Sequence, residues 1–174
     1  MQTKPVRRIL LSLLALILAI SAMLFVPAQK SYAFTDNQTG EITAYLRVEE
    51  PSFKIKYIHS IHLSEVLESY EIFPSDSLRL VGLEYEDFNV GMPSNAGFGE
   101  TFVEKDGKYI IEGMDRRMDE FRLFVGDVDA GLYFLADGEE YDLKKTLVRG
   151  NSYTFNVQRL SVYQLLKGVN LDDR

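Results

Sequence analysis

The densest group of side chains that could do chemistry lies between residues 57 and 68. Both histidines of the chain, His59 and His62, are found here beside Ser60, and Glu68 follows closely. Serine, histidine and a carboxylate are the groups that nucleophilic hydrolases combine. A buried histidine beside a carboxylate would also be held in one tautomer and could gain basicity. The segment therefore indicates either catalysis or ligand binding.

The hydrolase interpretation depends on how the chain places His59. Residue types alternate over 53–62, which predicts a strand, and neighbouring residues of a strand point to opposite faces. His59 and Ser60 should therefore not hydrogen-bond directly, and the chain holds no G-x-S-x-G motif. A tight turn and a return strand over 66–73 would bring Glu68 opposite the region of His59 or Ser60. We assign no catalytic residue and keep such a hydrolase as an alternative to a core or ligand-binding histidine.

A metal centre would need several ligands that converge on one point. His59 and His62 are three positions apart and leave opposite faces of a regular strand. Asp127, Asp129 and Asp137 could attract calcium, but the chain has no EF-hand loop, and a solvated turn is the simpler interpretation. We therefore expect no metal and no cofactor.

A long loop over residues 88–99 is the second candidate for a binding element. It holds three glycines, a proline and two phenylalanines, and its centre is Gly91-Met92-Pro93. Long loops in compact domains often bind ligands, although this one has neither the spacing nor the lysine of a phosphate-binding loop. A structural crossover between two sheets is the other interpretation.

Two adjacent arginines, Arg116 and Arg117, form the third candidate. In an acidic domain they could hold an anionic carboxylate in a bidentate grip. Because Asp115, Asp119 and Glu120 surround them, a neutralised surface turn is the favoured interpretation.

Short segments with period-two alternation dominate the chain beyond residue 40. Turn-forming glycine pairs such as Asp106-Gly107 and Asp137-Gly138 separate them. Together they predict an all-β fold, an antiparallel sandwich or barrel-like domain of roughly 8–10 short strands. Residues 160–167 favour a short helix or a last strand. The expected strands cover 42–48, 53–62, 66–73, 78–85, 99–104, 108–112, 121–125, 132–136, 140–148 and 153–158.

The N-terminus has the pattern of an export signal. A short basic start precedes an apolar run from Ile9 to Val26, and Ser31-Tyr32-Ala33 provides small residues of the kind that signal peptidases require. Two interpretations stay open: a signal peptide cleaved after about Ala33, or a single-pass anchor that crosses the membrane through residues 9–26. Both place the rest of the chain outside the cytoplasm, at the cell surface, in the periplasm or secreted.

Charge supports this division of the chain. The formal net charge is -7, but residues 1–33 hold four basic residues and no acid, so the other 141 residues hold 15 basic and 26 acidic ones. A body with a charge of -11 is a poor partner for nucleic acid. The absence of cysteine excludes disulfides and a lipidated N-terminal cysteine. We expect a signal or anchor over 1–33, a short lead-in over 34–44, one all-β domain over 45–168 and a polar tail over 169–174.

These motifs together resemble an uncharacterised bacterial family, domain of unknown function 1850, over about residues 45–158. The family's loop usually has a further glycine two residues before Gly91, where this chain has Asn89. The resemblance implies small exported proteins whose genes commonly lie beside TRAP-type transporters of the TAXI subgroup. It implies no activity. The residues that would form a shared motif or ligand-binding site are Tyr57, His59, Ser60, Glu68, Gly91, Met92 and Pro93.

We therefore expect an exported, non-enzymatic accessory or binding protein for solute uptake. Its partner would be a TRAP-type transporter subunit or a small organic solute. A cell-envelope adhesion module is a further alternative, and it would show an exposed aromatic patch and no pocket.

Overall fold

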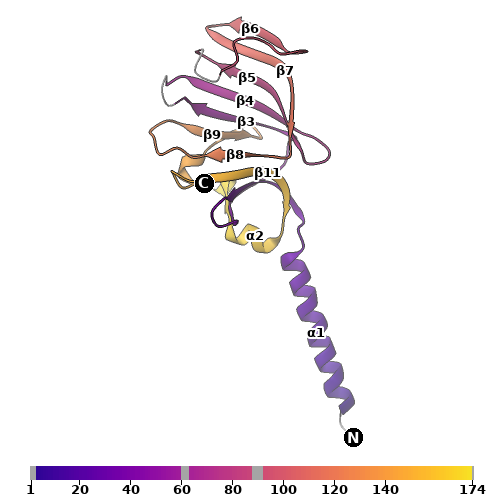
Figure 1. Ribbon diagram of the computed structural model, residues 1–174. Coiled ribbons are helices and arrows are strands. Elements are labelled where there is room, and N and C mark those ends of the chain that lie inside the picture. The colour runs from indigo at the N-terminus through magenta and orange to yellow at the C-terminus, as the bar shows by residue number, and fades with distance from the viewer. Residues whose placement is uncertain (1–2, 60–62, 88–91, 174) are drawn as a thin grey trace.

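The computed structural model describes residues 3–59, 63–87 and 92–173 of the chain. Within these residues, one long helix precedes twelve strands that form two sheets. The prediction of an all-β, sandwich-like domain behind an apolar helix is confirmed. Figure 1 shows the helix extending away from the stacked sheets, with α2 and the C-terminus at the same end of the domain.

Helix α1 spans Thr3–Phe25. Its segment Pro5–Phe25 is long and apolar enough to cross a membrane, and none of it is buried against the domain. Leucine and isoleucine side chains point outward all around it, which is typical of a helix made for an apolar solvent rather than for a protein core.

The smaller sheet is built around the first strand of the domain. Its strand order is β12 (Val169–Asn170), β2 (Ile42–Arg47), β1 (Gln29–Asp36), β11 (Ser152–Leu160) and β8 (Glu120–Phe124). β1 lies in the centre and pairs antiparallel with β11 from Gln29 opposite Leu160 to Asp36 opposite Tyr153. Strands from both ends of the chain therefore close this sheet.

The larger sheet is antiparallel throughout. Its order is β10 (Glu139–Asp142), β9 (Leu132–Ala136), β3 (Ser52–Ile58), β4 (Glu65–Ile72), β5 (Leu78–Tyr85), β7 (Lys108–Met118) and β6 (Thr101–Lys105). A 3-10 turn over Leu143–Lys145 follows β10. Helix α2 spans Val162–Lys167. It begins with a capping box formed by Ser161 and Gln164.

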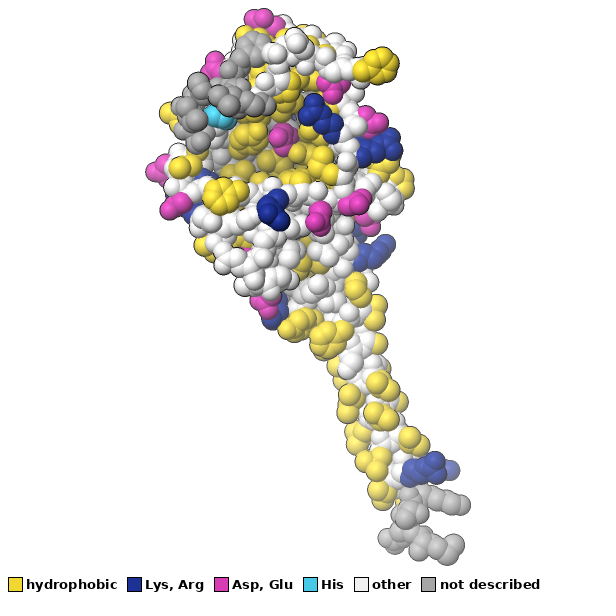
Figure 2. Space-filling model, in the orientation of Figure 1, with side chains coloured by type: hydrophobic (Ala, Val, Ile, Leu, Met, Phe, Trp, Pro, Cys, Tyr) yellow, Lys and Arg dark blue, Asp and Glu magenta, His cyan; other side chains and the backbone are white. Residues whose placement is uncertain are grey.

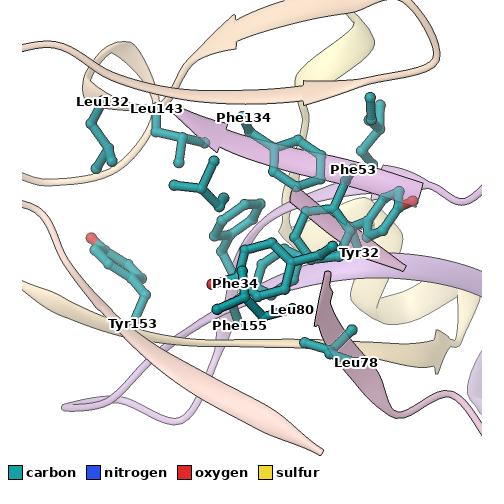
Figure 3. Close-up of a cluster of buried hydrophobic side chains, with 14 of the residues drawn as sticks. Tyr32, Phe34, Phe53, Leu78, Leu80, Leu132, Phe134, Leu143, Tyr153 and Phe155 are labelled. Carbon is teal, nitrogen blue, oxygen red and sulfur yellow. The ribbon is translucent and has the colours of Figure 1, made fainter. Parts of the chain in front are cut away.

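Aromatic rings from both sheets fill the space between them (Figure 3). Tyr32 and Phe34 come from β1, Phe155 from β11, and Phe53 and Phe134 from the facing sheet. Their ring centroids lie 4.9–6.1 Å apart, mostly tilted or edge to face, as aromatic pairs prefer. Alternation along each strand directs every second side chain into this core.

Two of the expected boundaries are wrong. Residues 34–44 are no lead-in, because β1 already begins at Gln29 and Ser31 to Phe34 are fully buried. Residues 169–174 are no free tail either, since β12 pairs with β2 and Leu171 is only 2% exposed. The small residues that resemble a cleavage site are instead the centre of a core strand.

Tyr32 offers a direct test of how β1 is tied to the opposite sheet. Its hydroxyl donates to the carbonyl oxygens of Glu50 and Ser52, at 2.9 and 3.1 Å, and burial raises its pKa. Tyr32→Phe should lower the free energy of unfolding by about 1–3 kcal/mol, because two partly buried hydrogen bonds are lost. Urea unfolding measures this, with Tyr163→Phe at an exposed tyrosine as the control. Equal stability of the two variants would contradict the assignment.

Candidate functional site

The centre of the site is a carboxylate between two tyrosines on the inner face of the larger sheet. Glu68 and Tyr70 are two residues apart on β4 and so share one face. The β3–β4 register places Ile55 opposite Glu68 and Val66 opposite Tyr57. Tyr57 is therefore the diagonal neighbour of Glu68, which a long side chain can reach.

Both tyrosines use their hydroxyls to bind this carboxylate. The Tyr70 hydroxyl donates to Glu68 Oε2 at 2.6 Å, and the Tyr57 hydroxyl also donates to Glu68. Burial raises the pKa of Glu68, and the two hydrogen bonds partly oppose that rise. Burial and the adjacent carboxylate raise the pKa of each tyrosine, so both remain donors at neutral pH.

Aromatic packing holds this group in place. The ring of Tyr70 stacks on Phe53 with centroids 4.8 Å apart and on Phe121 at 5.3 Å. In the described part of the chain, no lysine or arginine forms an ion pair with Glu68. The two tyrosine hydroxyls are thus the main replacement for the water that the Glu68 carboxylate loses on burial. The carboxylate can still accept further hydrogen bonds.

A cavity of about 320 Å³ begins at Tyr57. Tyr57 and His59 line it from the end of β3, and Lys144 lines it from the 3-10 turn. The rest of the lining is mainly apolar and comes from β8, from the segment before β9 and from the first residue of β9: Leu123, Phe124, Val128, Ala130 and Leu132. Figure 2 shows the upper half of the domain hollowed, with hydrophobic side chains lining the hollow and acidic and histidine side chains among them.

The expectation that Glu68 lies opposite His59 or Ser60 is wrong. The turn after β3 is tight: the His59 amide donates to the carbonyl of Ser64, and the Leu63 amide donates back to His59. The strands therefore pair with Ser64 beside His59, and Glu68 lies four residues farther along, roughly 13 Å at the rise of a strand. Ser60 and His62 lie outside the described residues.

The long loop approaches the same end of the sheet. Tyr57, Val66 and Tyr85 form one row across β3, β4 and β5, and the Tyr85 hydroxyl donates to the carbonyl of Pro93. Met92 packs against the core. The fold thus brings the two parts of the sequence motif near one another, while Gly91 lies outside the described residues.

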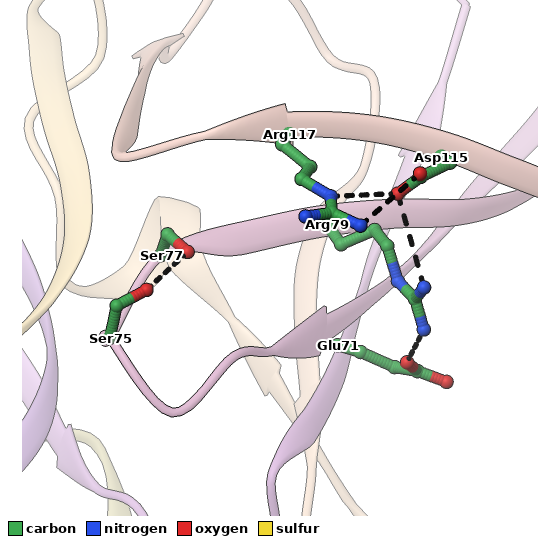
Figure 4. A network of polar contacts seen from close by, with 6 residues as sticks. All are labelled: Glu71, Ser75, Ser77, Arg79, Asp115 and Arg117. Atoms are coloured by element: carbon green, nitrogen blue, oxygen red, sulfur yellow. Dashed lines mark hydrogen bonds and ion pairs between the residues drawn. The ribbon is translucent and has the colours of Figure 1, made fainter.

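The arginine pair is separate from this site. Arg117 donates twice to Asp115, at 3.0 and 3.3 Å (Figure 4). Its guanidinium also lies over the ring of Phe73. Arg117 in turn lowers the pKa of the Asp115 carboxyl. Arg116 lies 3.8 Å from Glu100. Carboxylates of the chain itself pair with both arginines, so their charge is neutralised, but the expected turn is wrong, because both residues lie in strand β7.

Three contributors were missed in the sequence. Tyr70 could have been found, because a residue two positions after Glu68 shares its face. Phe121 and Lys144 come from distant segments, and no local pattern connects them to Tyr57. A larger cavity of about 480 Å³ lies elsewhere, and of the residues discussed for the site only Tyr70 and Phe53 line it. Among the described residues, no three histidines or carboxylates group as metal ligands.

Comparison with known families identifies the part of the chain that contains this site. Residues 53–143 match the family model described as "Domain of unknown function (DUF1850)". The match runs from Phe53 in β3 to Leu143 at the start of the 3-10 turn and includes Tyr57, Glu68 and Pro93, and it ends one residue before Lys144. Comparisons with curated proteins and with solved structures found no match.

Proposed function

The chain belongs to the family of domain of unknown function 1850, and on that premise we propose that it is a membrane-tethered, non-enzymatic binding protein outside the cytoplasm. In this proposal it assists a TRAP-type transporter of the TAXI subgroup in the uptake of a small organic solute. The observation that carries the binding role is the cavity between β3, β8 and the 3-10 turn.

The lining of this cavity suits a small organic acid. It is mainly apolar with a few polar groups at defined positions, as in most small-molecule sites. The Lys144 ammonium and the His59 ring would face the polar end of the solute, and Leu123, Phe124 and Leu132 would contact its carbon skeleton. Lys144 is held in position by donation to the carbonyl of Val128 at 2.7 Å.

The strand register supports a proposal without an enzymatic role. Glu68 pairs with tyrosines and lies opposite Ile55, so the carboxylate does not orient His59 as the base of a hydrolase requires. Glu68 instead shapes the site, because it fixes the ring of Tyr57, which lines the cavity.

Retention of α1 is the part of the proposal that concerns location. Cleavage after Ala33 would remove the first five residues of β1, including the fully buried Tyr32. An uncleaved α1 keeps this strand whole. Arg7 and Arg8 precede the apolar stretch and favour the cytoplasmic side, which places the domain outside.

Uptake measurements test the proposed function. A strain that lacks the gene should take up labelled organic acids more slowly through its TRAP transporter, and the wild-type gene should restore the rate of uptake. Lys144→Gln should restore it poorly, because the cavity loses its cation. Lys145→Gln, a change of the same kind at the neighbouring exposed lysine, should restore it fully. Unchanged uptake of every TRAP substrate in the deletion strain would overturn the proposal.

A further inference from the structure

The structure points to a lipid-contacting surface at the base of the domain, and we infer that helix α2 rests in the headgroup region of the bilayer beside α1. This inference depends on the proposed retention of α1 as an anchor. We define the α2 face as Val162, Tyr163 and Leu166. It is the side of α2 that the domain leaves exposed.

The α2 face is apolar, and each of its three residues is exposed in part. Val162, Tyr163 and Leu166 are 37, 43 and 77% exposed. Their spacing places them on one side of a helix, and Lys167 borders them with its ammonium 5.4 Å from the centre of the Tyr163 ring. Leucine, tyrosine and lysine in this arrangement are typical of helices that lie in a membrane interface.

The position of α2 relative to α1 is fixed by direct contacts. The ring of Phe25, the last residue of α1, lies 5.2 Å from the ring of Tyr163. Behind it, the Ala28 amide donates to the Leu160 carbonyl, and Arg159 donates to the Ala28 carbonyl at 2.9 Å. The link between helix and domain is therefore short and pinned to the segment that leads into α2 (Figure 1).

The length of α1 then sets the height of α2 above the bilayer. At 1.5 Å per residue, the 21 residues of Pro5–Phe25 span about 31 Å, close to the thickness of a hydrocarbon core of about 30 Å. Phe25 accordingly lies at the boundary between acyl chains and headgroups. Because Tyr163 contacts Phe25, the α2 face lies at that boundary too.

Charge indicates which force holds the face there. The chain beyond residue 33 carries a formal charge of -11, and Lys167 is already paired with Glu41 at 2.7 Å. Attraction to anionic lipid is therefore weak, and burial of the apolar side chains drives the contact. The contact should consequently form on zwitterionic lipid and persist at high salt.

The absence of tryptophan from the chain makes a direct test available. Full-length protein carrying Leu166→Trp is reconstituted into phosphatidylcholine vesicles with or without brominated acyl chains. Its emission should shift to shorter wavelength and be quenched by the bromines. Phe98→Trp, at a fully exposed loop residue before β6, should remain unquenched. Leu14→Trp, in the middle of α1, should be quenched strongly.

The three reporters separate the possible failures. Quenching at Leu14→Trp without quenching at Leu166→Trp overturns the lipid contact and leaves the anchor intact. Loss of quenching at both positions overturns the anchor and the lipid contact together. Shielding of Leu166→Trp in native membranes but not in pure lipid would show that a protein covers the α2 face, and it too overturns the inference.

Discussion

A chain that begins at Phe34 should fail to fold, whereas a chain that begins at Gln29 should unfold in one cooperative transition. The shorter chain lacks five of the eight residues of β1, the central strand of the smaller sheet. Both neighbours of that strand, β2 and β11, then lose hydrogen-bonding partners. The sheet would be divided in its centre rather than trimmed at its edge.

The expected loss is large on the scale of protein stability. Removing the Tyr32 side chain from the aromatic core costs about 3–5 kcal/mol by comparison with other large-to-small core changes. The unpaired backbone groups of β2 and β11 add to this cost. Since whole domains are stable by only about 5–15 kcal/mol, the shorter chain should have no folded state to melt.

Circular dichroism with thermal unfolding distinguishes the two chains, and the one beginning at Gln29 is the matched control. The mass of the natural protein extracted from membranes supplies the second measurement. It should include α1 if the anchor is retained. A natural N-terminus at Gln29 would refute retention but not the fold, whereas a folded natural protein beginning at Phe34 would refute the role of β1.

Glu68→Gln should raise the thermal stability at pH 7 and flatten its dependence on pH. Burial raises the pKa of the Glu68 carboxyl above its ordinary value of 4.5. The folded chain therefore holds this proton at pH values where the unfolded chain has released it. The contribution of Glu68 to the free energy of unfolding is fully present below pH 4.5 and is lost as the pH rises through the pKa of Glu68 in the folded chain. A glutamine side chain has the size of glutamate and retains an oxygen that accepts hydrogen bonds, but it carries no charge.

Melting temperatures at pH 4 and pH 7 check this expectation. The difference between Glu68→Gln and wild type should be small at pH 4 and should grow in favour of glutamine at pH 7. Glu104→Gln, at an exposed position on β6, should follow wild type at both. Glu68→Leu should be less stable by about 1–3 kcal/mol for each tyrosine hydroxyl left without an acceptor.

A charge that lowers stability is a mark of a functional site rather than of a structural one. If Glu68 serves binding, Glu68→Gln should combine higher stability with reduced uptake of the solute. Lower stability of Glu68→Gln at both pH values would instead show that the carboxylate is a structural partner of Tyr57 and Tyr70.

Local patterns in the sequence were sufficient for most of the larger sheet. The alternation over 66–73 corresponds to β4, and that over 53–62 to β3 as far as Ile58, because each strand has one buried face and the buried residues recur at every second position. The short helix or strand expected at 160–167 is the helix α2. Its capping residues, Ser161 and Gln164, were visible in the sequence.

The features that were missed depend on contacts between distant segments. The small residues of β1 match the cleavage pattern of a leader, and only pairing with β2 and β11 reveals a strand. The partner of Glu68 was misplaced because the register depends on the length of the turn after His59. Lys144 reaches the cavity from more than eighty residues along the chain.

The central position of β1 has a consequence for the order of events during biogenesis. β1 is the first strand to emerge, yet its partner β11 is almost the last, and 131 residues separate Ala28 from Arg159 where the two ends meet. The smaller sheet cannot close until nearly the whole chain has been made. Folding dominated by such distant pairings is slow. During that interval the edge of β1 that later pairs with β11 stays open, which makes this stage the most vulnerable to aggregation and to proteases.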